Sequence, residues 1–355
     1  PALGQAYGDR LVPMDAFTAF EPAMDITEVP DLSALAFIMF TSGTTGRSKG
    51  VMLSQKNLFS AMPAFLDPFD DVKKYTGWNT DEFSSLSALP MFHISAMTSL
   101  VSWSITGHSI NLCNNLKYFY RDLGAMHSEV MAVVPVLLKS IYSDVMKGRR
   151  DRLNGLCVLT CGAAMFDPKI LSDMMEKGFF VAQMYGLTET FGDGILNFTQ
   201  VEKHMSAVGK PDDHAEYKLD ETGEICIRGG CVMLGYYKDP EATAEVLDAD
   251  GWFHTGDLAR VDEDGFYYIT GRKKNIIILD NGENVSPEEL ENLLSKCEAV
   301  KECIVREKGK KICAVIYCGE ADQQTVRDFI TETNRTLPLY KRMSAVEFST
   351  EPLPR

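Results

Sequence analysis

The sequence predicts an α/β protein: a large domain of parallel α/β layers plus a small β-barrel, followed by a small α+β domain. Up to about residue 200, short apolar runs alternate with helix-like stretches, as in EVMAVVP before VLLKSIYSDVMK. Strand, helix, strand order is typical of a mainly parallel sheet. From about 205 to 272, short strands with Gly and Asp turns predict an antiparallel barrel or sheet. A basic cluster at 272–274 then precedes a compact α+β unit.

The elements follow in chain order from local patterns. AFIMF predicts a strand, and Ser54 is a plausible N-cap for a helix over 55–65. SSLSALP, EVMAVVP, LCVLTCG and FFVAQMYG predict further strands, with helices after His93, over VLLKSIYSDVMK and over DPKILSDMMEKG. The turn at 262–265 between LARV and FYYIT predicts a hairpin. Ser286, Pro287 and Glu289 predict a helix start, and ECIVRE and KICAVIYC predict two more strands.

These elements suggest a domain division. We expect a large domain at 1–272, with its α/β part at 1–204 and its barrel part at 205–272, and a small domain at 273–355.

Composition narrows the class of protein. The chain has 355 residues, 45% of them hydrophobic and 24% charged, which is ordinary for a soluble globular protein. A net charge of −15 disfavours nonspecific nucleic-acid binding. LAFIMF and NIIIL are far too short to span a membrane, and no signal-peptide pattern is found. The nine cysteines form no C-x-x-C pair and match no zinc spacing, so we expect reduced, mostly buried thiols in a cytoplasmic protein.

Residues 37–54, FIMFTSGTTGRSKGVMLS, contain a loop rich in Gly, Ser and Thr that ends at Lys49. The spacing of Gly43, Gly46 and Lys49 differs from the phosphate-binding loop of nucleotide hydrolases, and a strand rather than a helix follows. We therefore expect the loop to join two strands. Its backbone N–H groups and the hydroxyls of Thr41, Ser42, Thr44 and Thr45 can hold phosphate oxygens, with Lys49 as a mobile cation.

Further motifs follow in a fixed order: PMFH at 90–93, GAA at 162–164, MYGLTET at 184–190, TGD at 255–257 and GRKK at 271–274. In this order and spacing the chain, from about residue 35 on, resembles the adenylate-forming superfamily of acyl-CoA synthetases, peptide-synthetase adenylation domains and luciferases. The resemblance implies ATP, Mg²⁺ and coenzyme A as cofactors. It also implies two half-reactions: adenylation of a small-molecule carboxylate with release of pyrophosphate, then attack by a thiol on the acyl adenylate.

The resemblance also implies residue roles. Glu189 is expected to bind Mg²⁺, Thr188 the α-phosphate, Tyr185 the adenine face and Asp257 the ribose hydroxyls. Lys274 matches the hinge of the small domain, and NGENVS at 281–286 matches a loop lining the thiol tunnel. The residues expected to act in catalysis are Lys49, His93, Thr188, Glu189 and Arg272, with Mg²⁺ on Glu189 and Thr41. Those expected to bind nucleotide or coenzyme A are Thr41, Ser42, Gly43, Thr44, Thr45, Gly46, Lys49, Gly162, Ala163, Ala164, Met184, Tyr185, Gly186, Thr188, Asp257, Arg272, Lys274, Gly282 and Asn284.

The acid itself is suggested by the residues around His93, which matches a carboxylate-pocket position of acyl- and aryl-CoA ligases. HISAMTSL lacks the aspartate that peptide-synthetase domains use for the substrate amine, and an unpaired ammonium in an apolar pocket would cost several kcal/mol. The expected lining is Ile94, Ser95, Ala96, Val134 and Met184. GRKKNIIILDNGENVSPEELE resembles bacterial long-chain fatty-acid ligases, so we expect a fatty acid.

The sequence leaves other substrates, acyl acceptors and roles open. The protein could act on aryl or other carboxylates, deliver the acyl group to an acyl carrier protein, or be a nucleotide- or acyl-adenylate-binding fragment without full activity. From the resemblance we expect the chain to be short at both ends for the superfamily and to lack the segment with its C-terminal catalytic lysine. We expect an incomplete large domain at the N-terminus, an incomplete small domain at the C-terminus, and poor adenylation by the polypeptide as written.

Overall fold

A computed structural model describes residues 31–41, 48–66, 72, 83–113, 115–162, 168–197, 201–211, 213–279, 283–309 and 311–353. Residues 35–355 belong to one unit, whose elements are given below.

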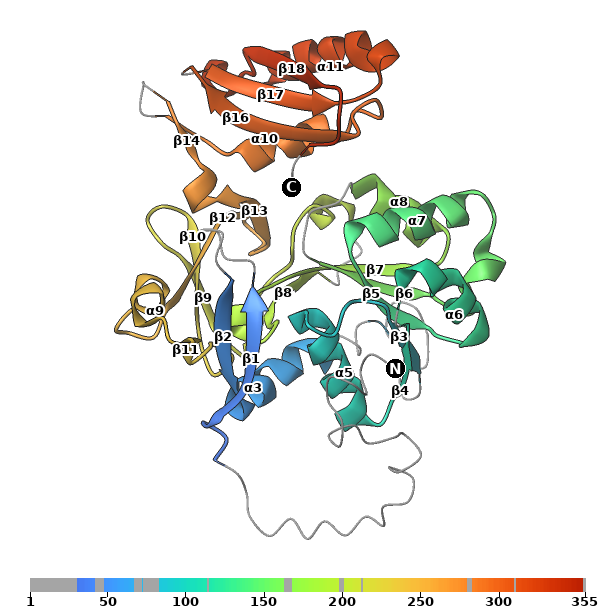
Figure 1. Ribbon diagram of the computed structural model, residues 1–355, viewed down its shortest axis with the longest axis vertical. Helices are drawn as coiled ribbons and strands as arrows, with labels where there is room; N and C mark the ends of the chain where they lie inside the picture. The colour runs from blue at the N-terminus through green and yellow to red at the C-terminus, as the bar shows by residue number, and fades with distance from the viewer. Residues whose placement is uncertain are drawn as a thin grey trace, which may run out of the picture. The chain divides into compact units, whose positions relative to one another are not determined.

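A six-stranded sheet has the order β4-β3-β5-β6-β7-β8 (Figure 1). Neighbouring strands from β4 to β7 are parallel, and only β8 runs antiparallel, beside β7. This confirms the mainly parallel sheet. The strands are β3 (Ser84–Ser87), β4 (Ser109–Leu112), β5 (Val130–Val133), β6 (Val158–Cys161), β7 (Phe180–Gly186) and β8 (Gly194–Asn197).

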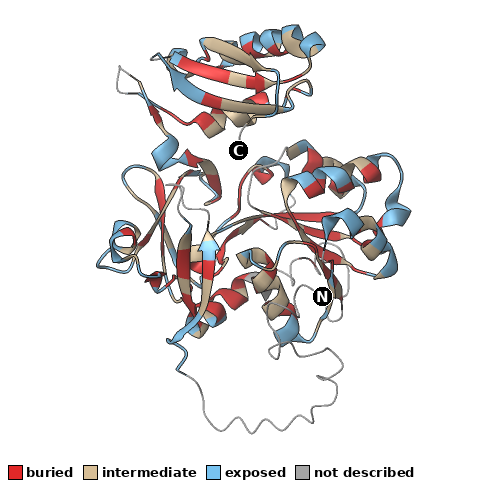
Figure 2. Cartoon of the chain, viewed as in Figure 1, coloured by how far each residue is buried: buried red, intermediate tan, exposed pale blue. Residues whose placement is uncertain are grey.

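Helices cover both faces of this sheet because its strands alternate apolar side chains between two cores. Met131, Leu159 and Val181 share a cluster with residues of α6, α7 and α8, whereas Val130 and Val158 pack with Trp103 of α5. Figure 1 shows α5 on the opposite side of the sheet from α7 and α8, and Figure 2 shows buried residues along the central strands. The helices are α5 (Ile94–Thr106), α6 (Phe119–Ala125), α7 (Pro135–Met146) and α8 (Pro168–Glu176).

The strands flanking the glycine-rich loop, β1 (Leu35–Thr41) and β2 (Lys49–Ser54), form an antiparallel pair in which Thr41 is opposite Lys49. The expectation that the loop joins two strands is thus confirmed. Ser54 caps α3 (Gln55–Leu66) by accepting a 3.1 Å bond from the Asn57 N–H. AFIMF differs from expectation, because it lies outside the parallel sheet: β2 pairs instead with β11 (Gly235–Tyr236).

A four-stranded antiparallel sheet, order β13-β12-β10-β9, follows in the chain. The predicted hairpin is present, with Val261 of β12 opposite Tyr267 of β13. The strands are β9 (Glu216–Leu219), β10 (Glu224–Arg228), β12 (Phe253–Val261) and β13 (Tyr267–Arg272), and α9 (Pro240–Val246) precedes β12.

After β13 the chain builds a separate core from α10, β16, β17 and α11. The predicted helix start is confirmed, because Pro287 begins α10 and Ser286 Oγ accepts the Glu289 N–H at 3.3 Å. The elements are β14 (Ile277–Ile278), β15 (Asn284–Val285), α10 (Pro287–Leu294), β16 (Glu302–Lys308), β17 (Lys311–Tyr317), α11 (Gln323–Thr336) and β18 (Ala345–Ser349). Short 3-10 turns are η2 (Leu116–Tyr118), η3 (Arg150–Leu153), η4 (Thr188–Thr190), η5 (Glu202–His204), η6 (Lys273–Asn275), η7 (Glu320–Asp322) and η8 (Leu339–Lys341).

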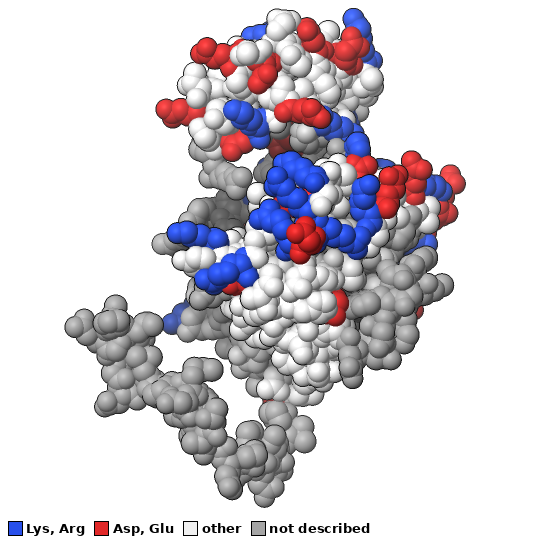
Figure 3. All heavy atoms as spheres, turned by 90° about the vertical axis from the view of Figure 1, so that its right-hand side faces the viewer, with Lys and Arg blue, Asp and Glu red and all other residues white. Residues whose placement is uncertain are grey.

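Charge is unevenly distributed on this acidic chain. Figure 3 shows Lys and Arg side chains gathered on the side where Figure 1 places α6, α7 and α8. Arg152, paired with Asp144 of α7, lies 4.1 Å from the centre of the Tyr120 ring, and Arg150 lies 4.7 Å from that of Phe179. These guanidinium groups therefore help to pack the surface. Within the described residues, every helix falls short of the length and apolar character that a bilayer crossing requires.

Candidate active site

A cavity of about 290 Å³ lies where the end of β7 meets β12, β13 and α10. Its walls include five of the residues singled out from the sequence, namely Met184, Tyr185, Gly186, Asp257 and Arg272. The other lining residues are Gln183, Leu187, Val208, Ile269, Thr270, Gly271, Glu288, Glu291 and Asn292. Three motifs far apart in sequence, MYGLTET, TGD and GRKK, therefore meet at one cavity.

Asp257 is the buried polar centre of this cavity. Its Oδ2 accepts a 2.9 Å hydrogen bond from the Tyr185 hydroxyl, and its Oδ1 lies 2.8 Å from Arg272 Nε. Asp257 and Arg272 are opposite each other in the β12–β13 ladder, so the ion pair follows from the strand register. Burial raises the pKa of Asp257, opposed by Arg272 and by the Tyr185 hydroxyl.

Tyr185 acts here as a neutral donor. Burial and the negative charge of Asp257 raise the pKa of Tyr185 well above its usual value, so the phenol keeps its proton. The result is a prearranged carboxylate with a hydroxyl on one oxygen and a guanidinium on the other. Such a carboxylate can accept further hydrogen bonds from a ligand's vicinal hydroxyls through its remaining lone pairs.

Gly162 follows β6 directly, and a Cβ there would lie 3.4 Å from the backbone oxygen of Met184. The β6 end therefore runs close to the β7 segment that lines the cavity, and the expected approach of Gly162 to an adenine edge stays a prediction. Ala163 and Ala164 lie outside the described residues. A Cβ on Gly186 would come within 2.5 Å of the Gly192 backbone oxygen, so glycine is needed for this turn of the chain.

A second cluster joins Lys49, Glu189 and Tyr236. The Tyr236 hydroxyl donates a 2.9 Å hydrogen bond to Glu189 Oε1, and Lys49 Nζ lies 4.5 Å from the centre of the same ring. The backbone also ties this region together, because the Met233 N–H donates to the Glu189 carbonyl at 2.8 Å. Burial, followed by the charge of Glu189, raises the pKa of Tyr236 and keeps it a donor.

The two clusters are linked along one stretch of chain, since Tyr185 ends β7 and Glu189 lies in η4 just beyond it. Thr188 is in the same turn, and Thr41 is paired with Lys49 across β1 and β2. Glu189 and Thr41 offer only oxygen donors, which suits Mg²⁺, and Lys49 adds a positive charge on the same side. Ser42, Gly43, Thr44, Thr45 and Gly46 lie outside the described residues.

His93 lies at the exposed N-cap position of α5, and its ring is 4.7 Å from that of Phe92. The residues that line the 290 Å³ cavity do not include His93 or the expected acyl-pocket residues other than Met184, as far as the described chain goes. Ala96 is instead buried beside a separate cavity of about 30 Å³. Ile94 and Ser95 begin α5, and Val134 directly precedes α7. Their expected role in substrate binding stays a prediction.

The segment after Arg272 carries the remaining expected residues. Lys274 is exposed in η6, and Asn284 of β15 is paired with Ile278 of β14. Gly282 and Asn281 lie outside the described residues. The structure therefore leaves the thiol-tunnel role a prediction.

Sequence reasoning missed three residues that hold this region together: Tyr236, Glu224 and Lys273. Tyr236 was part of the apolar run VMLGYY, and no signal linked it to Glu189. Glu224 begins the apolar strand GEICIRG, and such a buried carboxylate needs a partner. That requirement was the available signal for Lys273, whose Nζ lies 2.7 Å from Glu224 Oε2.

Comparison with known proteins places the chain in a family. The family described as AMP-binding enzyme matches residues 7–237. The chain is 31% identical to a feruloyl-CoA synthase from Amycolatopsis sp, over 91% of this chain and 68% of that protein. It is 31% identical to a long-chain-fatty-acid–CoA ligase from Salmonella typhimurium, over 89% of this chain but only 58% of that protein.

Solved structures give a similar result. The o-succinylbenzoate CoA synthetase of Bacillus subtilis, in complex with its acyl-adenylate intermediate, is 27% identical with a TM-score of 0.76, covering 92% of this chain and 67% of that one. The same enzyme with ATP and a magnesium ion gives a TM-score of 0.75 at 27% identity, covering 92% and 69%. The α/β fold expected from the sequence is thus confirmed. The chain belongs to the AMP-binding enzyme family, the adenylate-forming enzymes that include AMP-forming acid–CoA ligases using ATP, Mg²⁺ and coenzyme A.

Proposed function

We propose that the protein activates a carboxylic acid with ATP and passes the acyl group to coenzyme A. The observation that carries this proposal is the convergence of Tyr185, Asp257 and Arg272 on one cavity. Tyr185 precedes Glu189 by four residues, and Glu189 belongs to the cluster with Lys49 and Tyr236. In this arrangement the nucleoside would lie at the first group and the polyphosphate at the second. The division near residue 272 and the hinge at Lys274 are part of the proposal.

The chemistry follows from charge. A substrate carboxylate oxygen attacks the α-phosphorus of ATP, the bond to the bridging oxygen breaks, and pyrophosphate leaves. Because both reactants are anions, the site must supply positive charge, and we assign this role to Lys49 and Arg272. Mg²⁺ held by Glu189 and Thr41 would neutralise phosphate charge. Thr188 would hold the α-phosphate, and the thiol of coenzyme A would then displace AMP from the acyl carbonyl.

A fatty acid is the first substrate to test, given the likeness to a long-chain-fatty-acid–CoA ligase. Aryl carboxylates are the second, because a feruloyl-CoA synthase is equally similar at 31% identity. Transfer to an acyl carrier protein is the alternative for the acceptor. The non-enzymatic alternative is a module that binds nucleotide or acyl adenylate.

Two measurements test the proposal. Calorimetry with the 355-residue chain measures binding of ATP and of non-hydrolysable acyl-adenylate analogues with alkyl or aryl chains. Pyrophosphate release by the protein is then followed across fatty, aromatic and amino acids, with and without coenzyme A. We expect binding of ATP and slow thioester formation with fatty or aromatic acids, since poor adenylation is expected of this polypeptide. Turnover confined to amino acids would refute the acid assignment, and coenzyme-independent transfer to a carrier protein would refute the acceptor.

Glu189→Ala provides a specific variant for the metal. It removes the carboxylate expected to hold Mg²⁺, so magnesium-dependent pyrophosphate release should be lost while the fold is retained. Unchanged activity would remove Glu189 from the metal site.

A further inference from the structure

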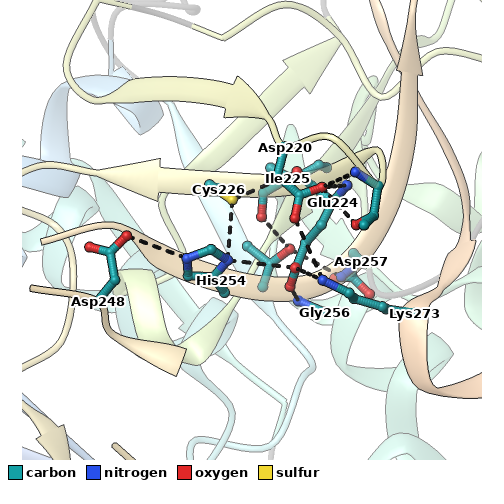
Figure 4. Close-up of polar contacts among 11 residues, drawn as sticks. Asp220, Glu224, Ile225, Cys226, Asp248, His254, Gly256, Asp257 and Lys273 are labelled. Carbon is teal, nitrogen blue, oxygen red and sulfur yellow. Dashed lines mark hydrogen bonds and ion pairs between the residues drawn. The ribbon is translucent and has the colours of Figure 1, made fainter. Parts of the chain in front are cut away.

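Beside the cavity, strand β12 departs from its neighbour β10. Glu224 is opposite Leu258 and Cys226 is opposite His254, so Thr255, Gly256 and Asp257 together face the single residue Ile225. Figure 4 shows this turn and its polar contacts. Such a bulge re-aims side chains at the edge of a ladder, here that of Asp257.

Two polar side chains fix the shape of the bulge. Thr255 Oγ1 donates to the Ile225 carbonyl at 2.8 Å and accepts the Asp257 N–H at 3.1 Å. Glu224 Oε1 accepts the Gly256 N–H at 2.7 Å. Gly256 has φ +75°, which favours glycine, so its N–H is presented to Glu224 by an unusual backbone conformation.

The other oxygen of Glu224 holds the next segment of chain. Lys273 Nζ lies 2.7 Å from Glu224 Oε2 and 3.5 Å from Asp220 Oδ2. Glu224 is 4% exposed, and an unpaired carboxylate at that depth would be strongly unfavourable. One side chain therefore connects the bulge that presents Asp257 with the residue that follows Arg272.

The same cluster contains potential metal ligands, because ligand atoms of Asp220, Cys226 and His254 lie within 4.8 Å of one another. Lys273 already places its positive charge against the Asp220 carboxylate. Burial and the charge of Glu224 raise the pKa of the Cys226 thiol to about 11, so it is not a thiolate at neutral pH. The ammonium of Lys273 lies beside both Glu224 and Asp220 and offsets their negative charge.

We propose that Glu224 is a positioning residue for nucleotide recognition: paired with Lys273, it holds the Thr255–Gly256–Asp257 turn so that Asp257 faces the ribose hydroxyls. This inference rests on the proposed function, which places the ribose at Asp257. Glu224 itself is not among the described residues that line the cavity. Its effect should therefore be seen in sugar selectivity rather than in affinity for phosphate.

The test is calorimetric binding of ATP, 2′-deoxy-ATP and 3′-deoxy-ATP to the 355-residue chain. The readout is the ratio of the deoxynucleotide Kd to the ATP Kd. In Glu224→Ala we expect this ratio to fall by about tenfold toward 1, because the Asp257 carboxylate is no longer held where it accepts a charge-assisted hydrogen bond from a ribose hydroxyl. Pyrophosphate affinity should change less than twofold. A general loss of stability would not alter the ratio.

Further variants separate the two contacts of Glu224, one with the Gly256 N–H and one with Lys273. Glu224→Gln keeps an acceptor for Gly256 but turns its amide toward the Lys273 ammonium, and the double variant with Lys273→Met removes that repulsion. We expect the ratio to fall in the single variant and to recover in the double variant. Asp144→Asn is the matched control. Asp144 is a buried acid on α7, 3.1 Å from Arg152 of η3, so its substitution should leave the ratio unchanged.

The outcomes distinguish the two proposals. If the wild-type chain binds ATP selectively and Glu224→Ala keeps the same selectivity, the positioning role is wrong and the proposed function stands. Should Glu224→Ala fail to fold, the same ratio in Glu224→Gln as in the wild type refutes the positioning role. If the wild-type chain does not discriminate ATP from either deoxynucleotide, the ribose assignment falls, and this inference falls with it.

Discussion

The hydroxyl of Tyr236 donates a 2.9 Å hydrogen bond to Oε1 of Glu189, and the same ring faces Lys49 Nζ at 4.5 Å. A tyrosine from β11 thereby joins the cation beside the glycine-rich loop to the carboxylate expected to hold Mg²⁺. Because Tyr236 is 6% exposed, its hydroxyl has little access to water as an alternative partner.

Tyr236→Phe should therefore weaken the use of Mg²⁺. The variant removes the donor that orients Glu189, and a hydrogen bond to a charged group contributes about 1.5–3 kcal/mol. We expect the Mg²⁺ concentration for half-maximal pyrophosphate release to rise by about tenfold. Tyr237→Phe is the control, since Tyr237 is 45% exposed. An equal effect of both variants would contradict a specific role for Tyr236.

Nucleotide affinity should depend on pH through Asp257. Burial raises the pKa of this carboxyl above 3.8, and its protonated form is a poorer acceptor for ribose hydroxyls. Affinity for ATP should thus begin to fall, as pH decreases, at a pH above that of an ordinary aspartate. Calorimetry at a series of decreasing pH values measures the change. In Asp257→Asn, affinity for ATP should be at least about tenfold weaker, and the pH dependence due to Asp257 should be absent.

The raised pKa of Asp257 should affect stability in the opposite direction to nucleotide affinity: as pH decreases, stability rises while affinity falls. Since the folded pKa of Asp257 exceeds the unfolded value, its contribution to the free energy of unfolding is larger at low pH and is lost as pH rises through the folded pKa. Asp257→Asn should remove this slope in urea denaturation curves. A slope that persists unchanged would assign it to other groups.

Gly271→Ala should destabilise the contact between β13 and the start of α10. A Cβ at residue 271 would lie 2.1 Å from Ser286 Oγ, the atom that caps α10, so one of the two elements must shift. We expect a loss of roughly 1–3 kcal/mol in urea denaturation. Gly124→Ala in α6 is the control, because nothing lies within 4 Å of its Cβ position. It should be neutral or stabilising by up to about 1 kcal/mol.

The thiols should react slowly in the native protein. All nine cysteines are free, and burial raises the pKa of Cys157 to about 11 and that of Cys161 to about 12. At pH 7.5 the thiolate fraction is thus very small. With Ellman's reagent we expect slow partial labelling of the native chain and nine equivalents in urea. Rapid labelling of several native thiols would show that these sites open readily.

Much of the fold could be predicted because the relevant signals are local. The parallel strands β5, β6 and β7 and their helices follow from alternating apolar runs, and the α10 start follows from Ser286 and Pro287. The reduced, mostly buried thiols were also predicted, and seven of the nine cysteines are buried. The strand and helix signals each depend on residues that are close to one another in the sequence.

The remaining features could not be predicted because they depend on pairing between distant segments. Nothing in AFIMF indicates that β1 and β2 leave the parallel sheet, since this depends on β11 almost two hundred residues later. The site shows the same limit. Motif order singled out Tyr185, Asp257 and Arg272, which line one cavity, whereas the ladder register that brings Glu224 to Gly256 leaves no trace in the sequence.

The pairing of β11 with β2 makes the cluster of Lys49, Glu189 and Tyr236 sensitive to the length of the chain just before β11. Two residues, Gly235 and Tyr236, make this short strand, and flanking bonds from Leu234 N–H to Met52 O at 2.9 Å and from Tyr237 N–H to Gly50 O at 2.7 Å set its alignment. Sliding by one residue would turn Tyr236 to the opposite face of the sheet. A one-residue insertion or deletion at 229–234 would thus disconnect Glu189 from its donor without changing any residue of the site.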